Sequence, residues 1–228
     1  MKLMQVKSFN TVSPRLARVF FIIATTLFAA SSQAAGLDFD KTFNDKGESR
    51  QLHYQATYSL DGKIHQVDIW RDRNQQLKRR TDDAVETFIF KPAKQTEWSM
   101  IVLDLKRKIR TDIDRTNLYR IGHFTDWFSM SHSLSRPSGA YQLSTTNAPM
   151  IRDQPVTACT WYSLTRGQTE SKICWSKKLR IPLLITDLNN QVQWKVTKAE
   201  TQNITPFVFQ IKDQGFVRNN ANEDIQAD

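Results

Sequence analysis

The sequence predicts a mainly β protein, built on a curved antiparallel sheet with a short helical cover. Polar and apolar residues alternate with a period of two over most of the chain after residue 50, which is typical of strands with one buried face. In the first half of this region, breaks of two to five residues separate the strands. Connections this short join antiparallel neighbours, because a parallel crossover needs about a dozen residues. A single segment has a helical pattern.

The first 34 residues are predicted to be a cleaved secretory signal peptide. They contain four basic residues, no acidic residue, and an apolar run from Val19 to Ala30 that ends before Ser32-Gln33-Ala34. We expect cleavage between Ala34 and Ala35, since an apolar run of 12 residues is too short to span a bilayer. An uncleaved N-terminal anchor is the alternative.

Three parts are therefore expected: the signal peptide at 1–34, a single β-rich domain at 35–218, and a flexible polar tail at 219–228. Hydrophobic residues make up 39% of the chain, which is enough for a packed core and excludes a disordered protein. Removal of the signal peptide takes away four Lys or Arg residues and no acid, so the net charge falls from +9 to +5. This modest charge on an exported protein argues against a nucleic-acid partner.

The expected strands follow from the alternation and are bounded by turn residues. They are Leu52–Leu60, Lys63–Arg71, Gln75–Thr81, Val85–Lys91, Glu97–Asp104, Lys108–Asp114, a strand beginning at Tyr141, Val156–Leu164, Ser171–Ser176, Leu179–Thr186, Val192–Glu200 and Pro206–Ile211.

The first hairpin has the strongest turn signal, Asp61-Gly62. A two-residue turn there sets Tyr54 opposite Ile69 and Tyr58 opposite His65. This register separates an apolar face from a polar one, which supports it.

The strand at Glu97–Asp104 is apolar on both faces. Trp98 and Met100 point to one side, whereas Ile101 and Leu103 point to the other. A strand of this kind is buried on both faces, so we expect other parts of the chain to cover both sides of the sheet there.

The expected helical cover is the segment Thr125–Leu134. Thr125 can cap the helix start, and Asp126 lies near the positive end of the helix dipole. Pro137 ends the segment. A helix of about ten residues covers only part of so many strands.

The two cysteines are predicted to form a disulfide. A two-residue turn at Arg166-Gly167 places Cys159 directly opposite Cys174, at a separation that a disulfide can bridge. Two free buried cysteines are the alternative.

Catalytic and metal-binding patterns are missing from the sequence. Gly-x-Ser-x-Gly does not occur, and no histidine pair has the spacing of a helical zinc site. Ser131 and His132 are neighbours, but adjacent residues on a helix are expected to point apart. We therefore predict a protein that is not an enzyme and has no metal or cofactor; an unrecognised hydrolase is the weakest alternative.

Two basic clusters, Lys78-Arg79-Arg80 and Lys106-Arg107-Lys108, lie near predicted turns or on predicted exposed faces. An ordinary solvated strand face explains them most simply. The functional alternative is attraction to a membrane surface with anionic headgroups, or to an acidic envelope protein.

The aromatic residues of the predicted strands suggest the function. A curved sheet that a short helix covers in part leaves a concave apolar face, and we expect Tyr54, Ile69, Trp98 and Met100 to line a ligand there. The predicted function is a non-catalytic carrier or binding protein for a lipid or acylated molecule, held by apolar contact. If these side chains instead fill a packed core, the alternative is an envelope protein-interaction or sensor module with no lipid cargo.

The layout also resembles a known family. An export signal precedes strands that open with Tyr54-Gln55-Ala56-Thr57-Tyr58, a helix-like Asp126-Trp127-Phe128 interrupts them, and a late hairpin leads into Leu179-Arg180-Ile181-Pro182-Leu183. This order resembles the LolA/LolB-like periplasmic lipoprotein-carrier superfamily. The resemblance implies an unclosed half-barrel with a helical lid over a hydrophobic cavity, a periplasmic location and an acylated ligand.

Overall fold

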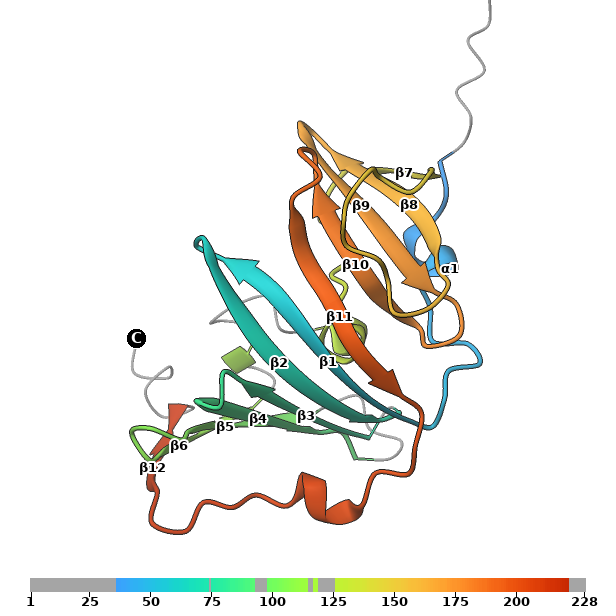
Figure 1. Ribbon diagram of the computed structural model, residues 1–228. Helices are drawn as coiled ribbons and strands as arrows, with labels where there is room; N and C mark the ends of the chain where they lie inside the picture. The colour runs from blue at the N-terminus through green and yellow to red at the C-terminus, as the bar shows by residue number, and fades with distance from the viewer. Residues whose placement is uncertain (1–35, 74, 93–97, 115–116, 119–125, 222–228) are drawn as a thin grey trace, which may run out of the picture. The chain divides into compact units, whose positions relative to one another are not determined.

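The computed structural model describes residues 36–73, 75–92, 98–114, 117–118 and 126–221 (Figure 1). The predicted signal peptide at 1–34 and its cleavage site at Ala34 and Ala35 lie outside these residues and remain predictions. The same holds for Thr125 and for residues 222–228 of the predicted tail.

The described strands form one open, curved sheet, which confirms the predicted fold class (Figure 1). The order across the sheet is β12-β6-β5-β4-β3-β2-β1-β11-β10-β9-β8-β7, and it is not closed into a barrel. The bounds are β1 Gln51–Leu60, β2 Lys63–Asp72, β3 Gln76–Thr81, β4 Val85–Phe90, β5 Ser99–Asp104, β6 Ile109–Asp114, β7 Gln142–Thr145, β8 Thr160–Arg166, β9 Thr169–Ser176, β10 Ile181–Asp187, β11 Val192–Glu200 and β12 Val217–Asn220. Strands β1 to β6 each begin and end within two residues of the prediction.

The β1–β2 hairpin has the predicted register. Tyr54 pairs with Ile69 and Tyr58 with His65. Both turn residues, Asp61 and Gly62, have positive φ values of 50° and 72°, as a type I′ turn requires. His65 is half-buried, and its ring stacks on Tyr58 at 5.1 Å between centroids.

The middle of the sheet is covered on both faces, as predicted. On one face, Met100 belongs to a large buried cluster that includes Trp127 of helix α3 (Trp127–His132). On the other face, Ile101 and Leu103 form a smaller cluster against which Phe216 of the C-terminal segment packs.

The C-terminal segment differs from the prediction. Pro206–Phe209 is a 3-10 helix, η1, where a strand at Pro206–Ile211 was expected. Proline has no N–H to donate to a strand ladder, and the alternation of exposed Phe207 and buried Phe209 imitates a strand pattern. The chain then runs along β3–β6 and forms β12, which pairs in parallel with β6 and includes Asn219 and Asn220 of the predicted tail (Figure 1).

In the described part of the chain, two short helices cover the face of the sheet that carries Met100. Phe39 of α1 (Phe39–Thr42) packs in the cluster of Tyr162 and Trp175. Helix α3 is capped by Asp126, whose carboxylate accepts hydrogen bonds from the backbone N–H groups of Phe128 and Ser129 at 3.1 and 3.3 Å. The described helix is thus shorter than the predicted segment 125–134.

The disulfide Cys159–Cys174 is present, with a Cα–Cα distance of 5.4 Å. The predicted register of this hairpin is wrong by two residues, because Cys174 pairs with Trp161 and the turn is Gly167-Gln168. Gly167 has φ 57°, as the first position of a type II′ turn requires. A shift of two residues keeps every side chain on its face, so the cysteines still meet, on a diagonal.

The double variant Cys159→Ala/Cys174→Ala should lower the free energy of unfolding by roughly 3 kcal/mol, since the disulfide closes a 15-residue loop in the unfolded chain. Urea unfolding followed by fluorescence measures this. A reducing agent should bring the wild type to the level of the variant and leave the variant unchanged. Equal midpoints for both proteins under oxidising conditions would contradict the prediction.

Candidate functional site

The four predicted ligand-lining residues lie together on one face of the sheet. Tyr54, Ile69, Trp98 and Met100 belong to one cluster and are exposed by 0%, 1%, 6% and 8%. The ring of Trp98 lies 6.1 Å from that of Trp127 on α3, in an edge-to-face arrangement. These side chains therefore form the packed core beneath the helical cover.

An open pocket of about 430 Å³ lies on the same face, beside α3. Tyr58 of β1, Trp194 of β11 and Met130 of α3 contribute apolar surface to it. Its polar lining includes Arg79 of β3 and Ser133, which follows α3. Tyr58 continues the face that carries Tyr54, lies nearer the hairpin end of β1 and is half-buried.

The aromatic wall of the pocket is held by packing and one hydrogen bond. The rings of Tyr58 and Trp194 stack at 6.5 Å between centroids. The indole N–H of Trp194 donates to the carbonyl oxygen of Pro182 at 2.9 Å. Because this polar atom has its partner in the protein, the ring can present carbon atoms to the pocket.

Sequence reasoning missed this pocket. Tyr58 was placed on the correct face, but Trp194 reaches it through the pairing of β1 with β11, where Tyr58 lies opposite Trp194. The two strands are far apart in sequence, and no local pattern predicts which distant strand completes a sheet.

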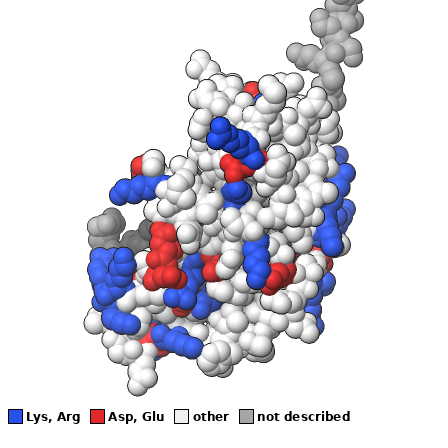
Figure 2. Space-filling model, in the orientation of Figure 1, with Lys and Arg blue, Asp and Glu red and all other residues white. Residues whose placement is uncertain are grey.

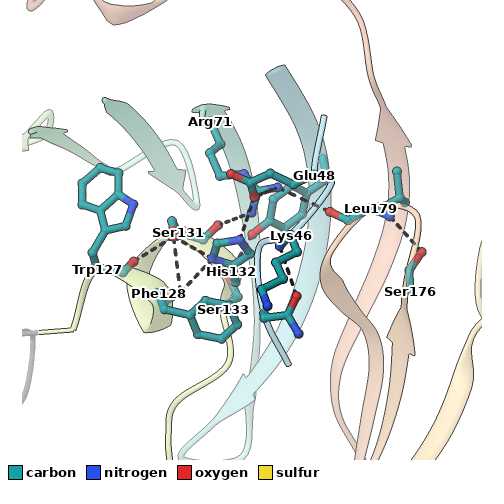
Figure 3. Close-up of polar contacts among 12 residues, drawn as sticks. Lys46, Glu48, Arg71, Trp127, Phe128, Ser131, His132, Ser133, Ser176 and Leu179 are labelled. Atoms are coloured by element: carbon teal, nitrogen blue, oxygen red, sulfur yellow. Dashed lines mark hydrogen bonds and ion pairs between the residues drawn. The ribbon is translucent and has the colours of Figure 1, made fainter. Parts of the chain in front are cut away.

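A buried polar cluster fixes α3 against the sheet (Figure 3). Arg71 of β2 is fully buried, and its guanidinium lies 3.1 Å from the carboxylate of Glu48. The same guanidinium donates to the carbonyl oxygens of Ser131 at 3.0 Å and Leu179 at 3.4 Å. One cation thus joins a strand, the segment before β1, the end of α3 and the turn before β10.

His132 extends this cluster. Its Nε2 lies 2.8 Å from the carboxylate of Glu48, and its Nδ1 lies 2.7 Å from Oγ of Ser131. The prediction that these neighbours point apart is wrong. The Ser131 hydroxyl turns back to the carbonyl oxygen of Trp127, and the His132 ring stacks on Phe128 at 4.2 Å, so both side chains lean toward the preceding turn.

The hydrogen-bonded chain from Ser131 through His132 to Glu48 has the residue types of a hydrolase triad. Unlike the nucleophile and base of an active site, however, Ser131 and His132 are buried. Ser131 and His132 are exposed by 0% and 1%. The Ser131 hydroxyl also has a second partner in the helix backbone. In the described residues this arrangement joins α3 to Glu48 through His132.

Burial sets the ionisation of this cluster. It lowers the pKa of His132, an effect that hydrogen bonding to Glu48 opposes and the charge of Arg71 strengthens. It also raises the pKa of Tyr54, whose hydroxyl lies 2.9 Å from that of Ser133. His132 is therefore held in its neutral form at neutral pH.

On the face shown in Figure 2, acidic and basic side chains lie near one another in small groups. Lys78 and Arg80, on the face opposite the pocket, form ion pairs with Glu86 and Asp83 at 2.8 and 3.0 Å. Lys106 and its two basic neighbours lie exposed at the turn between β5 and β6.

Metal and membrane-spanning features are absent from the described ranges. These residues contain no group of three or more His, Cys, Asp or Glu side chains that could hold a metal ion. None of their helices has the length and apolar character needed to cross a bilayer.

Comparison with known proteins assigns no family. No family model matches the chain, and no curated protein matches it. The crystal structure of MucB is similar with a TM-score of 0.42 and 12% identity, covering 75% of this chain and 61% of that chain. A structure of PNGF-II gives a TM-score of 0.39 and 10% identity, covering 77% and 32%. The chain therefore spans less than two thirds of either protein, and the function proposed below rests on its own residues.

Substitution of Arg71 by Met should lower the free energy of unfolding by roughly 3–5 kcal/mol, because it leaves the Glu48 carboxylate buried without its cation. Adding Glu48→Gln to this variant should recover part of the loss, which urea unfolding of both variants would measure.

The matched control is Arg107→Met, which removes an ion pair with Asp104 from a guanidinium that is 76% exposed. It should cost no more than about 1 kcal/mol. Equal effects of the two arginine substitutions would contradict the assigned role of Arg71.

Stability should fall on acidification through the ordinary pKa of histidine, about 6.5. The folded state lowers the pKa of His132, so the unfolded chain binds the proton first as the pH falls. Stability that is fully present above the ordinary pKa of histidine is therefore lost as the pH falls below it. The melting temperature of His132→Gln should change less than that of the wild type between about pH 7.5 and pH 5.5. Equal slopes for His132→Gln and the wild type would refute this role of His132.

Proposed function

We propose that the mature chain is a non-catalytic carrier or binding protein of the periplasm, which holds a lipid or acylated molecule on the apolar face of its sheet. The observation that carries this proposal is the open pocket beside α3. Tyr58, Met130 and Trp194 offer apolar surface there that the short helical cover leaves unfilled.

The holding force would be apolar contact. Burial of about 200 Å² of an acyl chain contributes about 5 kcal/mol before the cost of association. Binding of this strength is reversible, which suits a protein that must release its ligand. The buried state of Ser131 supports a role without catalysis.

A second candidate is an envelope interaction or sensor module with no lipid cargo. The observation that favours it is the close packing of Tyr54, Ile69, Trp98 and Met100. Because these side chains pack against one another, a ligand could occupy the open pocket but not the whole face of the sheet. The two candidates differ in whether an acyl chain enters that pocket.

Titration of the protein with decanoic acid and with 1-decanol tests the proposal, with tryptophan fluorescence as the signal. We expect a saturable change with a ten-carbon chain, because Trp194 lines the pocket. Met130→Lys should weaken binding of 1-decanol, which has no charge for the new cation to attract, at least about tenfold by placing a charge among apolar contacts.

The matched control is Ile64→Lys, which adds the same charge on the opposite face, at a side chain that is already 68% exposed. It should bind like the wild type. If neither amphiphile changes the fluorescence of any of these proteins, the carrier proposal is wrong and the interaction module is favoured.

A further inference from the structure

We propose that Arg79 recognises the negatively charged group of the ligand, so that the site takes an amphiphile with a carboxylate or phosphate at the end of an apolar chain. This inference rests on the proposed function and names the class of molecule that the pocket holds.

Arg79 points to the same face as the pocket. On β3 it lies between Ile69 of β2 and Thr87 of β4, so its cross-strand neighbours carry no charge. It is half-buried and lines the pocket together with Tyr58 and Trp194. Its guanidinium lies over the Tyr58 ring, 5.5 Å from the centroid.

The neighbours of Arg79 in sequence show how this cation differs. Lys78 and Arg80 point to the opposite face, where each forms an ion pair with an acid of β4 or of the turn before it. Arg79 has no acidic partner among the described residues. Asp82, in the turn after β3, is instead bonded to His65 and to the backbone N–H of Gln66.

A half-buried guanidinium without an anion has lost part of its hydration and gained little in return, so an oxyanion placed against it is stabilised. The planar group offers paired N–H donors that match two oxygens of a carboxylate or a phosphate. Two serine hydroxyls that line the pocket are already engaged, since Ser129 donates to Asp126 and Ser133 is bonded to Tyr54. Arg79 is therefore the donor that the head group would meet. The ligand would then lie with its charged end at Arg79 and its chain against Met130 and Trp194.

Binding of decanoic acid, decyl phosphate and 1-decanol to the wild type and to Arg79→Gln tests this assignment. The substitution should weaken binding of both charged amphiphiles by about tenfold to a hundredfold, the range for a hydrogen bond to a charged group. Binding of 1-decanol should change less than about twofold, since the apolar wall is untouched.

Arg80→Gln is the matched control, because it removes the same charge from the adjacent residue on the opposite face. It should bind all three amphiphiles like the wild type, and melting temperatures would confirm that both variants fold. Inorganic phosphate alone should compete weakly; competition as strong as that of decyl phosphate would show a site for a free anion and overturn the assignment.

The outcomes separate this inference from the proposed function. If all three amphiphiles bind and Arg79→Gln affects them equally, an apolar site exists and the role of Arg79 is wrong. If none of them binds the wild type, the proposed function itself fails.

Discussion

The buried guanidinium of Arg71 is the constraint on which the rest of the structure depends. A six-residue helix such as α3 is too short to persist alone in water. Arg71 binds the carbonyl oxygen of Ser131 near the C-terminal end of that helix, where a cation also complements the helix dipole. Glu48 balances the charge and binds His132 as well. The position of the cover is therefore set by a charged cluster that is costly to break, and not by the helix itself.

This fixed position divides the face of the sheet. Beneath α3, apolar side chains such as Met100 pack into a core. Beyond it, Tyr58 and Trp194 line a pocket whose charged member, Arg79, has no acid beside it in the described part of the chain. The opposite face of β4 and β5 is closed by the C-terminal segment. An open apolar surface with a cation at its side is the arrangement that an anionic amphiphile fits.

Local features of the sequence were sufficient for much of the fold. Asp61-Gly62 sets one register, because both residues adopt positive φ, and that register is correct. Gly167 can occupy either central position of a two-residue turn. The predicted register of the β8–β9 hairpin was therefore wrong by two residues, although the predicted disulfide was correct. The site depends on pairings between distant segments, such as Tyr58 with Trp194, which alternation along one strand does not reveal. For the same reason the partnership of Arg71 with Glu48 was not anticipated.

The most direct test of the account is a nuclear magnetic resonance spectrum of the protein with a nitroxide-labelled fatty acid, read at the tryptophan indole N–H signals. Trp194 lines the pocket, whereas Trp70 stacks on His53 on the other side of the sheet. If the ligand occupies the pocket, the Trp194 signal should broaden strongly at ligand concentrations that leave the Trp70 signal sharp. Equal broadening of the two signals, or none in either, would contradict it.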